Sequence, residues 1–224
     1  MKSIAIIVPV LNEAENLPAL IAQFSKLSQP QDEVVIVDGG STDETLEILA
    51  DMNLQILSAH KGRASQMNAG ALHSDADILV FLHADTQLPE NALALIRKVV
   101  AEGAGWGRFN VIISGARPML KVIALFMNWR SRLTGIATGD QVIFIQRELF
   151  NDLGGFPEQP LMEDIEISKR LKKISRPACL SEKVITSGRR WQKHGIWKTI
   201  ILMWWLRFAY WRGVPATALT KYYR

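Results

Sequence analysis

Acidic side chains stand at several points of the sequence where an apolar run ends, and each is a candidate for chemistry. The first is Asp38, which follows the apolar run 34–37 and precedes two glycines. A Ser41-x-x-Glu44 capping box and a tight glycine turn explain the neighbouring residues but not Asp38 itself. Ligands of open α/β sheets bind beyond the carboxyl ends of the strands, so Asp38 is predicted to face a ligand.

Glu13 follows the first apolar run, residues 4–8, in a similar way. Asn12 is placed to cap the helix after it, with Glu15 three residues further on. That cap would leave the Glu13 carboxylate free to point into the same cleft as Asp38.

His83 and Asp85 flank a bend after another apolar run, residues 78–82. A carboxylate and an imidazole that converge can hold Mn²⁺ or Mg²⁺, with diphosphate oxygens and water as the other ligands. The alternative is that Asp85 caps the following helix, with Thr86 as a rival cap. The position of Asp85 opposite Asp38, across adjacent loops, favours the metal site.

Glu163 and Asp164 lie side by side at the start of a predicted helix. A general base for a sugar hydroxyl is a carboxylate whose pKa is set by burial and neighbouring charges. The alternative is structural, because the positive end of a helix dipole favours acidic residues.

Basic residues beside glycine are candidates for binding phosphate. Arg63 follows one glycine, and Arg189, Arg190 and Trp191 follow another. Guanidinium groups match phosphate oxygens in charge and geometry, so we assign the second group to a diphosphate or an acceptor. A solvated basic surface is the alternative.

A fold of alternating apolar strands and helices must position these candidates. The expected strands are residues 4–8, 34–37, 54–57, 78–82, 108–113, 142–145 and 178–185. The expected helices are residues 13–24, 42–50, 64–72, 89–101, 119–129, 163–174 and 196–211. This order predicts an α/β fold whose central sheet is mostly parallel and flanked by helices. We expect one domain over residues 1–190 and a helical appendage over residues 191–224.

The last predicted helix, residues 196–211, mixes tryptophan with basic residues. Its longest uncharged run, residues 199–206, is far short of the roughly 20 residues that span a bilayer. The mixture is typical of an amphipathic helix that lies in the interface of an anionic membrane. Packing on the body of the protein, or a homodimer contact, is the alternative.

Charge is divided unevenly along the 224 residues. Residues 1–167 hold 12 Lys and Arg against 21 Asp and Glu, whereas residues 168–224 hold 14 against one. The basic end suits an anionic partner such as phosphate or a lipid surface.

The single Cys179 excludes an intrachain disulfide framework, and the first residues lack the pattern of a signal peptide. We therefore expect a cytoplasmic protein, peripheral at the inner face of the membrane.

Seven motifs, taken in order, resemble the family 2 glycosyltransferases of the GT-A fold, and more narrowly the subgroup associated with radical-SAM and selenium-related domains. They are IIVPVLNEAENL (6–17), VDGGSTDET (37–45), GRASQMNAGA (62–71), FLHADT (81–86), GGF (154–156), MEDIEIS (162–168) and TSGRRW (186–191). The resemblance covers nearly the whole chain. It implies an inverting, hexosyltransferase-like enzyme with a nucleotide-sugar donor and a hydroxyl acceptor. The basic, tryptophan-rich end adds the expectation that this acceptor is lipid-linked or membrane-associated.

The resemblance implies that Pro9, Glu13 and Asp38 hold the donor nucleoside. Arg63 and Asn68 would line the nucleotide site.

It also implies that Asp164, beside Glu163, is the catalytic base. Asp85 stands in the position of the last Asp of the family's DxD motif and would bind a divalent cation, Mn²⁺ or Mg²⁺, on the diphosphate. His83 stands where the first Asp of that motif would be, so the metal site has one hard oxygen ligand fewer.

Two other functions remain as alternatives. A sugar-1-phosphate nucleotidyltransferase would carry a glycine-rich phosphate loop with Arg or Lys after the first strand, and residues 9–13 do not form one. A nucleic-acid binder would use the basic, aromatic end, yet it leaves the carboxylates at the strand ends without a role. We therefore expect no nucleic-acid partner.

Overall fold

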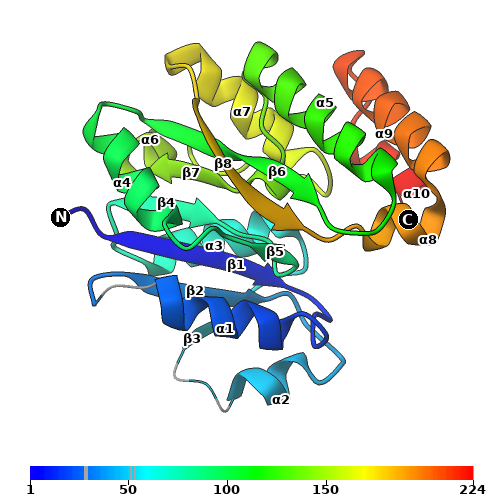
Figure 1. Ribbon diagram of the computed structural model, residues 1–224. Helices are drawn as coiled ribbons and strands as arrows, with labels where there is room; N and C mark the ends of the chain where they lie inside the picture. Colours follow the sequence, from blue (N-terminus) through cyan, green and yellow to red (C-terminus); the bar gives the residue numbers. More distant parts are fainter. Residues whose placement is uncertain (28–29, 51, 53, 224) are drawn as a thin grey trace.

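An eight-stranded sheet runs through the middle of the molecule (Figure 1), in a computed structural model that describes residues 1–27, 30–50, 52 and 54–223. The strands lie in the order β3-β2-β1-β4-β7-β6-β8-β5. Their bounds are β1 Ile4–Val10, β2 Glu33–Asp38, β3 Gln55–Ser58, β4 Ile78–Phe81, β5 Thr86–Gln87, β6 Trp106–Ile113, β7 Ile143–Gln146 and β8 Ala178–Thr186.

The sheet is mostly parallel, as predicted. β1 pairs in parallel with β2 and β4, β2 pairs in parallel with β3, and β6 pairs in parallel with β8. β7 is antiparallel to β4 and β6, and β5 is antiparallel to β8. Every residue of β1 is buried, which requires that both faces of the sheet are covered.

Helices cover both faces of this sheet. Their bounds are α1 Leu17–Leu27, α2 Thr45–Ala50, α3 Arg63–His73, α4 Ala92–Ala101, α5 Pro118–Thr134, α6 Arg147–Asp152, α7 Glu163–Ile174, α8 Arg189–His194, α9 Ile196–Trp211 and α10 Ala216–Tyr223. β5, α6, α8 and α10 were not expected from the sequence. They span only two to eight residues, too few for a clear hydrophobic period.

Alternate residues of β1 enter two separate cores, as the two-residue period of a strand requires. Ile4 and Ile6 pack with α1, α2 and α4 on one face. Ala5 and Ile7 pack with α3, α6 and α7 on the other. A Cβ atom on Gly70 would lie 2.5 Å from Ile7 Cγ2, so only glycine lets α3 approach β1 this closely. The two layers hold the carboxyl ends of β1, β2 and β4 at one edge.

The loop after β1 differs from expectation. We expected Asn12 to cap a helix from residue 13, but α1 begins at Leu17 and Asn12 has a φ of 55°. The Asn12 amide oxygen instead accepts a hydrogen bond from the Thr42 N–H, at 2.8 Å. The cap prediction is wrong because the loops after β1 and β2 bind each other.

The expected capping box before α2 is also absent. Asp43 Oδ1 accepts the Thr45 N–H at 3.0 Å, and the Ser41 hydroxyl donates to Asp38 at 2.5 Å. The serine therefore stabilises the Asp38 loop rather than the start of the helix.

Helix α9 forms over the predicted residues and packs on the body of the protein. Leu206 and Ala209 contact the start of α7, and Ile196 contacts α5. Its remaining side is both apolar and exposed: Trp197, Ile201, Trp204, Trp205, Phe208 and Trp211. None of the helices in the described ranges is long and apolar enough to cross a membrane.

Candidate active site

Side chains from the loops after β1 and β4 meet the first residue of α8. The guanidinium nitrogens of Arg189 lie 3.5 Å from Glu13 Oε2 and 3.4 Å from Glu15 Oε2. Arg189 Nη2 also lies 4.0 Å from Asp85 Oδ2. The structure thus brings together three predicted site residues, Glu13, Asp85 and Arg189, from distant parts of the chain.

The start of α7 brings a second cation to the acidic pair. Arg63 Nε lies 3.4 Å from Oε1 of Glu163, whose side chain is 5% exposed. Burial lowers the pKa of Arg63, but attraction to Glu163, Tyr223 and Asp164 outweighs burial, so the pKa lies above its ordinary value. Arg63 is therefore a permanent positive charge beside the two carboxyl groups.

Asp164 is held by the backbone of a neighbouring turn. The Gly139 N–H donates to Asp164 Oδ2 at 3.0 Å, and the Ile165 N–H donates to Oδ1 at 2.7 Å. Burial, and after it the charge of Glu163, raise the pKa of Asp164 to about 6, although these hydrogen bonds and the charge of Arg63 act to lower it. A carboxylate with a pKa this close to neutrality can accept a proton from a reacting hydroxyl.

His83 pairs with a carboxylate that the sequence analysis did not single out. Its Nδ1 lies 3.5 Å from Asp140 Oδ1. Burial lowers the pKa of His83, but the hydrogen bond and charge of Asp140 raise it above its ordinary value overall. Burial raises the pKa of Asp140, and the His83 hydrogen bond outweighs that, so the Asp140 pKa lies below its ordinary value.

Strained backbone conformations occur beside these acidic groups. In the described chain, the non-glycine residues with positive φ are Asn12 (55°), Val142 (53°) and Met162 (65°). Each lies within two residues of one of the acidic groups above. Such conformations cost about 1–3 kcal/mol each and gather at functional sites, where the surrounding structure enforces them.

A comparison with protein-family models identifies the family of the chain. The model described as Glycosyl transferase family 2 matches residues 5–146, more than half of the sequence. The chain belongs to glycosyl transferase family 2.

Relatives and solved structures agree with this family. The undecaprenyl-phosphate 4-deoxy-4-formamido-L-arabinose transferase of Serratia proteamaculans is 32% identical over 115 residues, which cover 46% of this chain and 35% of the relative. The chain therefore matches about a third of the length of such curated relatives.

Staphylococcus aureus TarS, solved with UDP, aligns with a TM-score of 0.69 and 20% identity, over 84% of this chain and 60% of that one. The mannosyltransferase PcManGT of Pyrobaculum calidifontis was solved with GDP-Man and Mn²⁺. It aligns with a TM-score of 0.61 and 24% identity, over 81% of this chain and 56% of that one. These likenesses confirm the GT-A fold.

The family implies a divalent cation, and one residue of this family 2 chain fits that role well. The Asp85 carboxylate is part exposed, and the Arg189 guanidinium lies 4.0 Å from it. Its oxygens suit a hard divalent ion whose other ligands are diphosphate and water. His83 fits less well because its Nδ1 faces Asp140 and its ring packs so tightly on Gly139 that a Cβ there would clash. In the described ranges, no three His, Cys, Asp or Glu side chains converge to hold a metal.

Asp38 lies in its predicted place, but its carboxylate binds its own loop. It accepts the N–H groups of Gly40 at 2.8 Å and Ser41 at 3.1 Å, and it is nearly fully buried. In this structure Asp38 shapes the loop after β2. Pro9, the other residue predicted near the nucleoside, is buried within β1 in register with Val37.

Two amide side chains of α3 form hydrogen bonds with backbone groups of β1, β2 and the GGF turn. Asn68 exchanges hydrogen bonds of 2.9 Å with both backbone groups of Phe156, which fixes the GGF turn. Gln66 Nε2 donates to the carbonyls of Val10 at 2.8 Å and Val37 at 2.7 Å. The sequence analysis missed Gln66, although it lies within the GRASQMNAGA motif.

Arg190 and Trp191 lie on either side of α8. The Arg190 guanidinium donates to the Tyr223 carbonyl at 2.8 Å and stacks on the Tyr223 ring, 3.7 Å from its centroid. Trp191 packs with Ile113 and Leu120 in an apolar cluster under α5. The two predicted residues thus have different surroundings, one at the end of α10 and one in a core.

A further cation was missed by the sequence analysis. The two terminal nitrogens of Arg130 are buried and have no hydrogen-bond partner in the described structure. Burial lowers the pKa of Arg130, and the charge of Asp164 opposes this. No motif contains Arg130, because its closeness to Asp164 arises only when α5 packs beside α7.

Proposed function

We propose that this chain is an inverting glycosyltransferase that moves a sugar from a nucleoside diphosphate to an acceptor hydroxyl. The observation that carries the proposal is Asp164, a part-buried carboxyl with a pKa raised to about 6, next to Arg63 and Glu163. The family match favours this function over the nucleotidyltransferase and nucleic-acid alternatives. Two proteins of the same fold were solved with ligands of the expected class, TarS with the nucleotide UDP and PcManGT with the nucleotide sugar GDP-Man.

The reaction is a single displacement. The acceptor oxygen forms a bond to the anomeric carbon while the bond from that carbon to the diphosphate breaks, and Asp164 takes the hydroxyl proton. General-base help of this kind contributes about 10²–10⁴-fold to the rate. The negative charge goes to the leaving diphosphate, near which we place Arg63, Arg189 and Arg190.

A divalent cation bound by Asp85 would supply further charge neutralisation on the diphosphate. We propose that the Arg189 guanidinium moves away from Asp85 when the donor binds and then contacts the diphosphate oxygens. A guanidinium pairs well with either a carboxylate or a phosphate.

We also propose that the protein works at the inner surface of an anionic membrane. The exposed apolar side of α9 lies beside a second apolar side, on α5: Val122, Leu125, Phe126, Trp129 and Leu133. We call these two sides together the α5–α9 face. A relative from Serratia proteamaculans has undecaprenyl phosphate in its name, so a lipid-linked acceptor is part of the proposal.

Donor binding tests the proposed function. UDP-, GDP- and dTDP-sugars are titrated into the protein with Mn²⁺ or Mg²⁺, and slow hydrolysis of each sugar is followed. We expect one nucleotide class to bind at least tenfold more tightly than the others. Equal and weak binding of all three, without hydrolysis, would refute the proposal.

A further inference from the structure

The last three helices enclose a cavity that no role described above explains. α8, α9 and α10 gather on the side of the molecule toward which β1 points (Figure 1). Between them lies a cavity of about 640 Å³, within the roughly 300–1,000 Å³ typical of ligand sites. Its lining comprises Arg190, His194, Lys198, Thr199, Ile201, Leu202, Trp205 and Tyr222.

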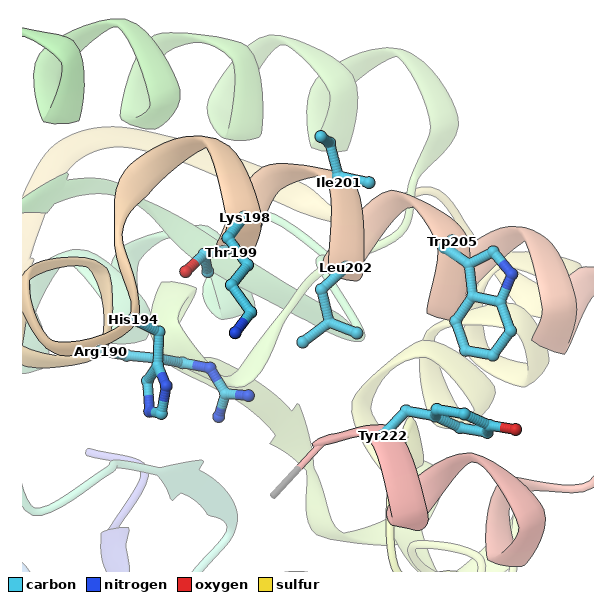
Figure 2. Close-up of a pocket in the computed structure, with 8 residues that line it drawn as sticks. All are labelled: Arg190, His194, Lys198, Thr199, Ile201, Leu202, Trp205 and Tyr222. Atoms are coloured by element: carbon cyan, nitrogen blue, oxygen red, sulfur yellow. The ribbon is translucent and has the colours of Figure 1, made fainter.

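The cavity has two chemically different ends. Figure 2 shows Arg190, His194 and Lys198 gathered at one end, and Trp205 with Tyr222 at the other. Arg190 lies near the Asp140 carboxylate, although no ion pair of Arg190 occurs among the described residues. No ion pair of His194 or Lys198 occurs in the described chain. An anion therefore complements one end and an apolar group the other.

Contacts within the protein hold side chains at both ends in place before any ligand binds. Arg190 is fixed by the carbonyl and ring of Tyr223. Trp205 and Tyr222 pack edge to face, with ring centroids 4.8 Å apart. Aromatic walls and a fixed cation lower the entropy that a ligand loses on binding.

The basic end adjoins the catalytic groups. Arg190 follows Arg189, which contacts Glu13 and lies near Asp85. Arg190 is also close enough to Asp140 to help lower its pKa, and the turn that holds Asp140 donates to Asp164. The apolar end leads the other way, since Trp205 and Ile201 are also part of the exposed α5–α9 face.

We propose that this cavity binds a long-chain lipid phosphate, with the phosphate at Arg190, His194 and Lys198 and the first part of the chain along Leu202, Trp205 and Tyr222. The inference rests on the proposed function, because the P–OH group of such a lipid phosphate would be the acceptor hydroxyl whose proton Asp164 takes. The chain then continues from Trp205 toward the membrane.

Farnesyl phosphate, a short isoprenoid phosphate, is the probe for this site. It is titrated into the full chain by calorimetry, beside farnesol and inorganic phosphate. We expect farnesyl phosphate to bind at least about tenfold more tightly than either, because only it fills both ends. Equal binding of inorganic phosphate would mean a free-phosphate site, equal binding of farnesol would mean a plain apolar groove, and either result would overturn the proposal.

Matched variants locate the binding. Lys198→Gln and Trp205→Ala line the cavity and should each weaken farnesyl phosphate binding about fivefold or more. Lys193→Gln and Trp204→Ala are neighbours outside the lining and should change it less than about twofold. Equal losses in all four variants would overturn the placement.

Nucleotide binding separates this inference from the proposed function. UDP and GDP affinities should be unchanged in all four variants. If the wild-type protein binds a nucleotide but not farnesyl phosphate, the cavity assignment fails while the transferase proposal stands. If it binds farnesyl phosphate but no nucleotide, the reverse holds.

Discussion

The proton-accepting capacity of Asp164 arises from a balance among its neighbours. Burial and the charge of Glu163 raise its pKa, whereas Arg63 and two backbone N–H groups lower it. Without the cation and the N–H groups the pKa of the carboxyl would lie higher, and without burial it would lie lower. The catalytic property therefore belongs to the surroundings of the residue and not to the residue alone.

Asp164→Asn should keep nucleotide binding and lose about 10²–10⁴-fold in transfer rate, because the amide cannot accept the proton. The measurement is kcat with the donor found by titration. Glu166→Gln, two residues along α7 and bonded to Arg170 and Tyr210, is the matched control and should keep most activity. Undiminished turnover in Asp164→Asn would remove Asp164 as the base.

The pKa of about 6 at Asp164 predicts the pH profile. The base works when ionised, so kcat should rise with pH up to about 6 and fall about tenfold per unit below it. Arg63→Gln removes a cation that lowers this pKa, so the inflexion should move to higher pH at saturating donor. A profile that stays in place, or moves to lower pH, would contradict the assignment.

Asp85→Ala should abolish most of the gain in nucleotide affinity that Mn²⁺ provides, because the diphosphate-bound ion loses its protein carboxylate. Nucleotide dissociation constants with and without Mn²⁺ measure the effect. Asp75→Ala, an exposed carboxylate at the opposite edge of the sheet, is the control. An unchanged response to Mn²⁺ in Asp85→Ala would show that Asp85 is not a metal ligand.

Single residues were easier to place from the sequence than to orient. The end of an apolar strand located Asp38 and Asp85 at the correct edge of the sheet. The sequence could not show that the Asp38 carboxylate turns back to Gly40 and Ser41, because that depends on the exact path of a short loop. Asp140 carried no signal because its partner, His83, is far away in the chain.

At the scale of elements, helix α9 has two tasks. Its buried side supports the start of α7, where Glu163 and Asp164 lie, and its exposed side is apolar. Removal of the whole helix would expose the core beside the catalytic pair. Substitutions on the exposed side are therefore the informative change.

Replacing Trp197, Trp204 and Trp211 together with Ser should reduce sedimentation with anionic vesicles at least about tenfold and leave the unfolding transition nearly unchanged. These side chains are 68%, 76% and 71% exposed, so they contribute little to the core. Leu72→Ser is the control, because Leu72 on α3 is even more exposed at 85%. Full sedimentation of the triple variant would exclude α9 as the membrane contact.

All strands except the two-residue β5, and the long helices, were predictable because their apolar residues show a hydrophobic pattern. The short helix α8 was not, yet it contributes Arg189 and Arg190. The exposed side of α5 was also missed, since its apolar residues look like core until the packing on β6 shows which of them face outward. The hydrophobic pattern of a sequence predicts which residues of a helix are apolar, but it does not show which part of the protein covers them.

At the scale of the whole molecule, nearly all acidic side chains lie in residues 1–167, whereas basic side chains are in excess in residues 168–224. The excess of basic residues in 168–224 is in the same part as the tryptophan-rich helix. Electrostatic attraction and apolar insertion would therefore act together at one membrane surface.

Binding to anionic vesicles should weaken as salt rises from 0.05 to about 0.5 M, and neutral phosphatidylcholine vesicles should bind several-fold more weakly at low salt. Salt screens the basic residues but not the insertion of tryptophan, so part of the binding should survive. Cosedimentation at each salt concentration measures this. Vesicle binding that changes with neither the salt concentration nor the lipid charge would show that the basic residues of 168–224 do not contribute to membrane binding.

The contact of Arg189 with Glu13 joins residues 176 positions apart in the chain. A ribosome finishes every carboxylate of the site, through Asp164, before it adds this arginine. The growing polypeptide therefore completes its reactive centre late in synthesis. A molecule that ends before residue 189 would keep the whole sheet and Arg63, and yet lack Arg189 and Arg190, two of the three cations that we place near the leaving diphosphate.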